Sequence, residues 1–195
     1  MTLKLTTADL LPLEQYHKQR PEFRQRLMVE KKRRRLDIGR YAHLYFENKV
    51  TMHYQVQEIL RAEKIFEPEG IAEELAAYNP LIPDGDNFKA TMMLQYTDIN
   101  ARRAALAELV GIEDHIWMKV AGFDAIYAIA DEDMDRSTED KTSAVHFLRF
   151  QFDAQHVAAL KSGAKLAAGI DHARYNETVD PVPEELARAL CADLA

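Results

Sequence analysis

The 195-residue sequence has a single cysteine, Cys191, which excludes a disulfide bond within the chain and a metal cluster held by cysteines alone. It has no apolar run close to the length that spans a membrane. Its first ten residues, MTLKLTTADL, lack the apolar segment and the small-residue cleavage site of a secretion signal. We therefore expect a cytoplasmic protein, with the cysteine packed on the apolar side of a C-terminal helix beside Leu186 and Leu190.

Several catalytic motifs are also missing. The sequence contains no GxGxxG for dinucleotides, no GxxxxGK phosphate loop, no GxSxG serine-hydrolase motif and no HExxH zinc motif. Net positive charge is missing too, because 25 Lys and Arg stand against 32 Asp and Glu, a formal net charge of −7. A general nucleic-acid-binding protein needs a basic surface, so the sequence disfavours that class.

The residue pattern predicts an α+β fold, an antiparallel sheet with helices packed mainly on one face. Residues 1–86 are helix-rich and residues 87–195 are strand-rich, and we expect one domain throughout. Neighbouring strands joined by tight turns pair antiparallel. Residues 131–140 form an acidic loop. Helices are predicted at 8–16, 21–35, 48–64, 71–78, 98–109, 153–161 and 184–194, and strands at 36–46, 90–97, 116–121, 125–130, 144–152 and 166–172.

Residues 46–64, FENKVTMHYQVQEILRAEK, carry the densest set of polar groups beside apolar ones and are predicted to form mostly one helix. Asn48 suits the N-cap position, because its side-chain oxygen can accept from a free backbone N–H. The helical period places one apolar side toward the core and an opposite side toward water. These two sets are Met52, Val56, Ile59 and Leu60, and His53, Gln57 and Lys64.

A third side of this helix is polar, because Thr51, Gln55 and Glu58 stack at i, i+4 and i+7. The favoured interpretation is a solvated face with a Glu58–Arg61 pair that contributes about 0.3 kcal/mol. The alternative is a polar wall that faces a pocket or a partner. The residues of this candidate polar surface or pocket are Glu47, Thr51, Gln55, Glu58, Arg61 and Arg149.

Two histidines are candidate metal ligands. His146 alternates with apolar residues in AVHFLRFQF and so points to the apolar face, and His172 ends a later strand. With Glu58 or Glu47 they could form a two-His, one-carboxylate site for non-haem iron or another divalent metal. No short-spaced ligand pair supports this site, and a lone histidine on an apolar face is more often a core residue.

The run Lys31–Arg35 gathers positive charge at a helix end, where the negative helix C-terminus favours it. A solvated helix end is the favoured interpretation, and a phosphate, nucleic-acid or acidic-partner site is the alternative. Apolar edges at Phe23 and Leu27 and in the last helix need covering, which predicts a homo-oligomer.

Short stretches from about residue 22 to the C-terminus carry a family resemblance. They are Phe46-Glu47-Asn48, Gln55, Gln57-Glu58, Leu60-Arg61, Glu63, Tyr78-Asn79, Ile82-Pro83, Ala90-Thr91, His146-Phe147-Leu148-Arg149-Phe150, Asp171-His172 and Tyr175. With them the chain resembles a bacterial domain-of-unknown-function family often encoded beside rubrerythrin-like proteins and an iron–sulfur oxidoreductase. The resemblance implies no reaction and no catalytic residue, and its genomic company implies a link to redox chemistry.

Three functions therefore stay open. The first is an accessory or partner-binding protein linked to a redox or oxidative-stress system. The second is a metal-binding protein or metalloenzyme that uses Glu58, His146 and His172. The third is nucleic-acid or phosphate binding through Lys31–Arg35, which the acidic total charge makes the least favoured.

Overall fold

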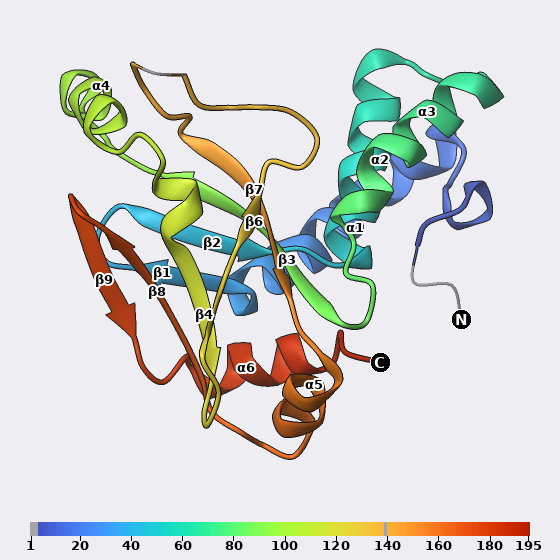
Figure 1. The fold of residues 1–195 in the computed structure, drawn as a ribbon. Helices are drawn as coiled ribbons and strands as arrows, with labels where there is room; N and C mark the ends of the chain where they lie inside the picture. The colour runs from blue at the N-terminus through green and yellow to red at the C-terminus, as the bar shows by residue number, and fades with distance from the viewer. Residues whose placement is uncertain (1–3, 139) are drawn as a thin grey trace.

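The computed structural model describes residues 4–138 and 140–195 and has an α+β architecture, as predicted (Figure 1). Its antiparallel strands divide between two sheets instead of the expected single one. Sheet A has the order β1-β2-β3-β7-β6, and sheet B has the order β5-β4-β8-β9. The strands are β1 Arg35–Ile38, β2 Ala42–Phe46, β3 Asn87–Leu94, β4 Ile116–Val120, β5 Ala125–Tyr127, β6 Ile129–Ala130, β7 Val145–Gln151, β8 Leu166–His172 and β9 Tyr175–Val179.

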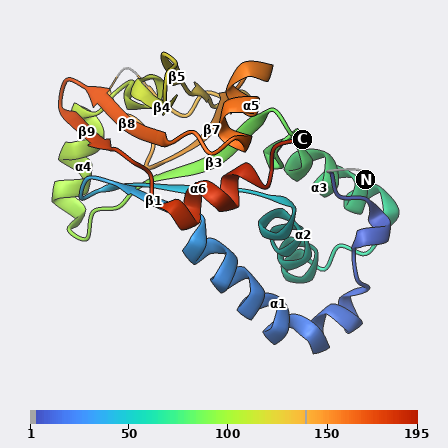
Figure 2. The same ribbon diagram turned by 90° about the horizontal axis from the view of Figure 1, so that it is seen from below.

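The first helices lie together beside one end of sheet A, as two views of the ribbon show (Figures 1 and 2). No helix in the described part of the chain is both long and apolar enough to cross a membrane. The helices are α1 Leu13–Arg33, α2 Lys49–Glu63, α3 Pro68–Tyr78, α4 Ile99–Glu108, α5 Ala154–Lys161 and α6 Glu184–Cys191, with 3₁₀ turns η1 Thr7–Asp9, η2 Asn79–Leu81 and η3 Ile112–His115.

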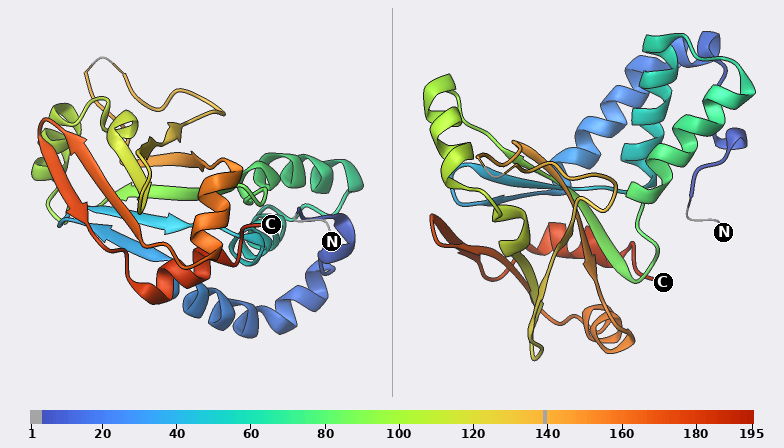
Figure 3. Two further views of the ribbon diagram at one scale, coloured as in Figure 1. Left: turned by 60° about the horizontal axis from the view of Figure 1, so that its bottom comes forward. Right: turned by 45° about the horizontal axis from the view of Figure 1, so that its top comes forward.

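The main hydrophobic core lies between the two sheets (Figure 3). Phe46, Met92 and Phe150 of sheet A and Met118 and Ile170 of sheet B are among its fully buried residues. Because side chains alternate along a strand, the neighbours of these residues in sheet A point to the opposite face. The strand registers place Lys89, Thr91, Phe147 and Arg149 there, and Glu47, which follows the buried Phe46, joins them.

Residues 36–46 form a hairpin, so the prediction of one continuous strand is wrong. The chain reverses between β1 and β2, where Gly39 has a φ of +67° that only glycine adopts without strain. A Cβ atom at this position would also lie 2.7 Å from the hydroxyl oxygen of Tyr175. Leu36 and Leu44 pair across the turn and point to the same face. The alternation of buried and outward side chains therefore continues from β1 into β2 as it would along one long strand.

Helix α1 runs through Pro21, where the sequence predicted a boundary between two helices. Proline removes one hydrogen bond from the helix interior and usually bends or ends it. Here contacts on both sides of the proline hold the helix against α2, since Tyr16 and Leu27 are both buried. Tertiary packing thus outweighs the local cost of the proline.

Helix α2 begins at the predicted cap. The Asn48 side-chain oxygen accepts from the backbone N–H groups of Val50 and Thr51, both at 3.0 Å. Met52, Val56 and Leu60 are buried in a second apolar cluster with residues of α3, as their period predicted. Gln57 was expected to face water but is fully buried, because the N-terminal segment crosses α2 and Leu11 donates its N–H to Gln57 Oε1 at 2.6 Å.

Strand β9 was not predicted, and its first residue links the two sheets. The Tyr175 hydroxyl donates to the carbonyl of Ile38 at 2.7 Å. It also accepts from the N–H groups of Tyr41 and Ala42 at 3.0 and 3.1 Å. One hydroxyl therefore satisfies the backbone of the β1–β2 turn, which belongs to the other sheet.

We predict that Tyr175→Phe lowers the free energy of unfolding by about 2 kcal/mol, because it leaves these turn groups without their partner. Chemical denaturation of the wild type and the variant measures the difference. Tyr45→Phe is the control, since no hydrogen bond of the Tyr45 hydroxyl is found among residues 4–138 and 140–195. Equal losses in the two variants would show that the turn does not depend on Tyr175.

Candidate functional site

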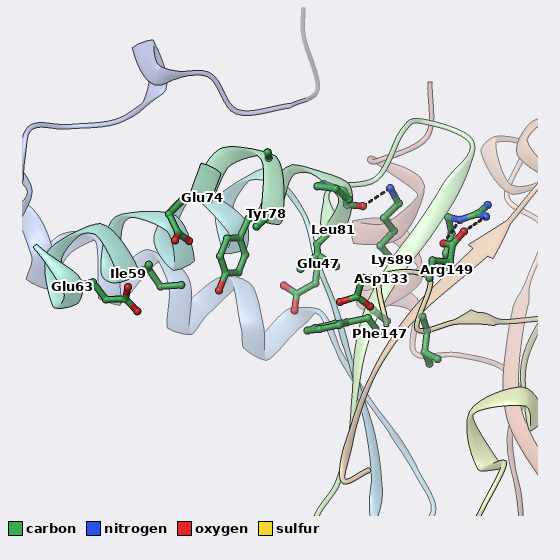
Figure 4. Close-up of a pocket in the computed structure, with 16 residues that line it drawn as sticks. Glu47, Ile59, Glu63, Glu74, Tyr78, Leu81, Lys89, Asp133, Phe147 and Arg149 are labelled. Atoms are coloured by element: carbon green, nitrogen blue, oxygen red, sulfur yellow. Dashed lines mark hydrogen bonds and ion pairs between the residues drawn. The ribbon is translucent and has the colours of Figure 1, made fainter. Parts of the chain in front are cut away.

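A cavity of about 690 Å³ lies between helices α2 and α3, the polar face of sheet A and the loop before β7 (Figure 4). We call it the helix–sheet cavity. Its volume falls within the range of small-molecule sites. Its lining residues are Glu47, Ile59, Glu63, Glu74, Ala76, Ala77, Tyr78, Pro80, Leu81, Lys89, Ala90, Glu132, Asp133, Phe147, Leu148 and Arg149.

Glu47 is the most unusual group in this cavity. Its residue is 6% exposed, and its Oε1 accepts from the Thr91 hydroxyl at 2.7 Å. Within the described residues, its Oε2 has no hydrogen-bond partner and no cationic side chain lies within 4 Å of the carboxylate. Figure 4 shows the carboxylate in the cavity beside Tyr78 and Phe147. Its position follows from strand alternation, because Phe46 points into the core.

The two cationic residues of the cavity wall have other partners. Lys89 Nζ lies 2.7 Å from Asp84 Oδ2 and donates to the carbonyl of Pro80 at 2.6 Å. Burial lowers the pKa of Lys89, and the neighbouring Asp84 partly opposes that effect. Arg149 forms a two-pronged ion pair with Glu132, at 2.7 and 2.8 Å. Neither cation is therefore paired with Glu47.

The end of the cavity between α2 and α3 is acidic, and Glu63 is exposed there. Glu63 ends α2, and Glu74 projects from α3. Partial burial raises the pKa of Glu74, and the negative charges of Glu63 and Glu73 raise it further. These carboxylates therefore repel one another, and the described residues contain no ion pair that joins either of them to a cation.

The loop between β6 and β7 supplies Glu132 and Asp133 to the cavity, and His146 holds both ends of it. His146 Nδ1 lies 2.6 Å from Asp131 Oδ2, and Nε2 lies 2.8 Å from the Thr142 hydroxyl. Asp131 also accepts from the N–H of Phe147 at 2.9 Å and from Arg136 at 3.1 Å. This His146–Asp131 network fixes the loop against sheet A.

Two of the six predicted polar-surface residues, Glu47 and Arg149, line the cavity. The other four do not. Thr51 is buried and completes the helix cap, with its hydroxyl donating to Asn48 O at 3.0 Å. Gln55 is half-buried on α2.

Glu58 and Arg61, the last of these residues, lie in an ion-pair cluster between α1 and α2. Glu58 accepts from Arg20 at 2.8 and 2.9 Å and from the Tyr16 hydroxyl at 2.7 Å. The expected partner Arg61 is farther away, at 3.3 Å. The hydrogen bonds from Arg20 and Tyr16 lower the pKa of Glu58 to about 2. Of the row predicted to be solvated or to line a pocket, Glu58 therefore joins the two helices.

The structure does not bring Glu58, His146 and His172 together. Glu58 binds α1, His146 is in the Asp131 network, and His172 Nε2 lies 3.2 Å from the carbonyl of Val110. In residues 4–138 and 140–195 no group of three or more His, Cys, Asp or Glu side chains is placed to hold a metal ion. The metal-site hypothesis has no geometric support.

The basic run Lys31–Arg35 is partly used within the chain. Arg34 is buried and forms ion pairs with Glu30 and Asp193, both at 2.7 Å. Arg33 also pairs with Glu30, and Arg35 pairs with Asp37. The run therefore ties the end of α1 to the C-terminal segment, which the sequence did not predict.

The apolar edges behind the homo-oligomer prediction are covered within the chain. Leu27, Leu186 and Leu190 are buried, and the Phe23 ring packs edge-on against Tyr16 and His53. Self-association therefore stays a prediction, and the apolar edges no longer support it.

Sequence reasoning missed most of the cavity wall. Ile59 had been placed in the core, and Glu63, Glu74, Tyr78, Lys89 and Phe147 were not identified as site residues, although their types suit a polar pocket. Tyr78, Glu63 and Phe147 do lie in stretches that carry the family resemblance.

The fold and this site define a two-sheet α+β protein with a mixed polar and aromatic cavity where its helices meet sheet A. The sequence profile of DUF3501, described as a protein of unknown function, matches residues 4–194, and the chain belongs to this family. The match confirms that the chain is an uncharacterised domain, and the link to rubrerythrin-like and iron–sulfur oxidoreductase genes stays a prediction.

A solved crystal structure is very similar to this one. It is a novel protein of unknown function from Burkholderia pseudomallei, 47% identical in sequence, with a TM-score of 0.93. The similarity covers 98% of this chain and 100% of that one. None of the curated proteins matches the chain. These comparisons establish the family and the fold.

We predict that Glu58→Gln destabilises the protein by about 2 kcal/mol at neutral pH, because Arg20 loses its charged partner. The folded-state pKa of Glu58 lies below its usual value of 4.5, so its contribution is present above pH 4.5 and is lost toward pH 2. Denaturation from pH 6 to pH 2 should give a steeper loss of stability for the wild type than for the variant. Parallel curves would contradict this role.

We also predict that Asp131→Ala releases the loop between β6 and β7, because His146, Arg136 and the N–H of Phe147 all lose an acceptor. Limited proteolysis should cut residues 132–142 at least about tenfold faster than in the wild type. Asp135→Ala is the matched control, since Asp135 is exposed on the same loop. Cleavage at the wild-type rate in Asp131→Ala would contradict the network's role.

Proposed function

We propose that this protein is an accessory, partner-binding protein that recognises a positively charged group in the helix–sheet cavity. The observation that carries the proposal is the Glu47 carboxylate, which is buried at the cavity wall with one hydrogen bond and no ion pair among the described residues. The effective penalty for burying an unpaired ion is several kcal/mol. A bound cation would offset that penalty.

The other buried charged side chains have partners that offset the free-energy cost of their burial. Glu30 pairs with Arg34, Lys89 pairs with Asp84, and Glu113 accepts hydrogen bonds from the Ser137 and Thr142 hydroxyls. Of the buried Glu, Arg and Lys side chains in the described residues, Glu47 is the one with a single hydrogen bond and no ion pair. A cationic ligand in the cavity would give Glu47 an ionic partner.

The aromatic rings of the cavity support the same choice. Tyr78 and Phe147 line it beside Glu47 (Figure 4), and aromatic faces attract cations. The Phe147 ring shows this attraction within the protein, because the Arg136 guanidinium lies 4.6 Å from its centroid.

We also propose that the partner belongs to a redox or oxidative-stress system, which is supported by the family resemblance alone, through its rubrerythrin-like and iron–sulfur oxidoreductase neighbours. The metal-binding alternative has less support, because Glu58, His146 and His172 have separate partners. Binding of nucleic acid or phosphate also has less support, because three of the five cations in Lys31–Arg35 form ion pairs.

We predict that Glu47→Gln weakens binding of n-butylammonium at least about tenfold, because it removes the buried negative charge. Isothermal titration calorimetry at low salt measures the affinity. The same substitution should leave stability without ligand unchanged or raise it by about 1 kcal/mol, because the buried charge is relieved.

Glu69→Gln is the control for this experiment, since Glu69 is exposed on α3 and does not line the cavity. Wild-type affinity in Glu47→Gln, or a large loss of its stability without ligand, would show that Glu47 has a structural role instead.

A further inference from the structure

A second cavity, of about 800 Å³, lies between the turn that follows α5 and helix α6. We call it the α5–α6 cavity, and its volume falls within the range of small-molecule sites. From its lining and its charge we infer that it binds a fatty acid, an aliphatic chain that ends in one carboxylate. The inference does not rest on the proposed cation site, because the two cavities share no lining residue in the described part of the chain.

Contacts within the chain hold the walls of this cavity together. Gly163, with a φ of +90°, turns the backbone from the end of α5 toward β8. The N–H of Val182 donates to the carbonyl of Leu166 at 2.7 Å, which fixes the segment before α6 to β8. The Cys191 sulfur lies 3.7 Å from the carbonyl oxygen of Leu160, so α6 also contacts the end of α5.

Most of the cavity lining is apolar. Four of the lining side chains are charged, and the others are aliphatic or glycine, apart from the Cys191 thiol. Ala187 and Cys191 line the cavity from successive turns of α6, and Pro181 and Pro183 line it from the segment before that helix. A ligand with many polar groups would lose its water here without compensation. A methylene chain avoids that cost, and each methylene buried raises the affinity by up to about fourfold.

The charged side chains of the lining leave an excess of positive charge. Arg188 and Glu184 form an ion pair at 2.7 Å, so their charges offset each other. Lys161 and Lys165 remain, and no ion pair of either ammonium group is found within residues 4–138 and 140–195. Lysine stems can lie along an aliphatic chain while their ammonium groups reach a carboxylate at its end. An apolar cavity with two free cations therefore matches an aliphatic chain with an anionic end.

The experiment compares octanoate, butanoate and the neutral octanamide by calorimetry at one ionic strength. We expect octanoate to bind at least about tenfold more tightly than butanoate, because the cavity buries more of its methylene groups. We expect it to bind about fivefold more tightly than octanamide, because the amide has no charge for the lysines to attract.

Two variants separate the charge from the space. Lys161→Gln/Lys165→Gln should reduce the affinity for octanoate to that for octanamide and leave octanamide unchanged. Ala187→Leu, which fills part of the cavity, should weaken both ligands at least about fivefold. Thermal unfolding without ligand verifies that each variant folds.

The matched control is Lys18→Gln/Lys32→Gln, which removes the same charge from exposed positions on α1 outside the cavity. It should keep the preference for octanoate. The same loss in both double variants would mean that overall charge attracts the carboxylate, and the inference would be wrong.

Cys191 reports where the ligand binds, because it lines the cavity and is the only cysteine of the sequence. Burial raises the pKa of its thiol, and the negative charge of Asp193 raises it further, so alkylation is slow enough to follow by mass spectrometry. Octanoate should slow alkylation by iodoacetamide with a midpoint at its calorimetric Kd, and n-butylammonium should not. Binding of octanoate without protection of Cys191 would contradict the site.

Other occupants of the cavity give different results. If Cys191 is protected without ligand and gel filtration gives the mass of a dimer, a second copy of the chain covers the cavity and the fatty acid is excluded. If monooctyl phosphate binds at least about tenfold more tightly than octanoate, the carboxylate is the wrong anionic group. Failure of octanoate to bind leaves the cation site intact, because that site is tested through Glu47.

Discussion

The packing of sheet A against sheet B is the constraint on which the candidate site depends. Each strand of sheet A must bury one set of alternating side chains, including Phe46, Met92 and Phe150, in the shared core. The side chains between them in sequence, including Glu47, Lys89 and Arg149, therefore lie on the opposite face of sheet A. A shift of one residue in register would exchange the two sets and remove both the core and the cavity wall.

The helical part of the chain turns that polar face into a cavity. Helix α2 is fixed to α1 through Glu58, Arg20 and Tyr16, and to α3 through the apolar cluster around Val56. The helices therefore lie against sheet A as one packed group, and their polar and apolar side chains close the cavity over Glu47. The His146–Asp131 network holds the third wall in place. The Glu58 ion pairs and the His146–Asp131 network therefore hold the cavity walls in place, although Glu58 and His146 do not line the cavity.

The sequence predicted local features well where local chemistry decides them. The Asn48 cap and the buried side of α2 are confirmed, because capping and helical period involve residues within one or two turns. The predictions for Gln57 and Pro21 were wrong for the opposite reason. Gln57 is buried by the distant segment at Leu11, and α1 stays helical through Pro21 because it packs along α2. The turn at Gly39 was missed because the alternation of two paired strands matched one longer strand.

The sequence by itself determined the α+β class, most of the strands and helices, and the alternation that separates Phe46 from Glu47. Only the tertiary structure decided which polar residues share a space, because Glu47, Tyr78 and Phe147 come from segments that are far apart in the chain. Residue types showed that Glu58 and Glu47 are both candidate carboxylates. Their partners decided between them, since Arg20 neutralises Glu58, while the carboxylate of the buried Glu47 has one hydrogen bond within the described residues, from the Thr91 hydroxyl.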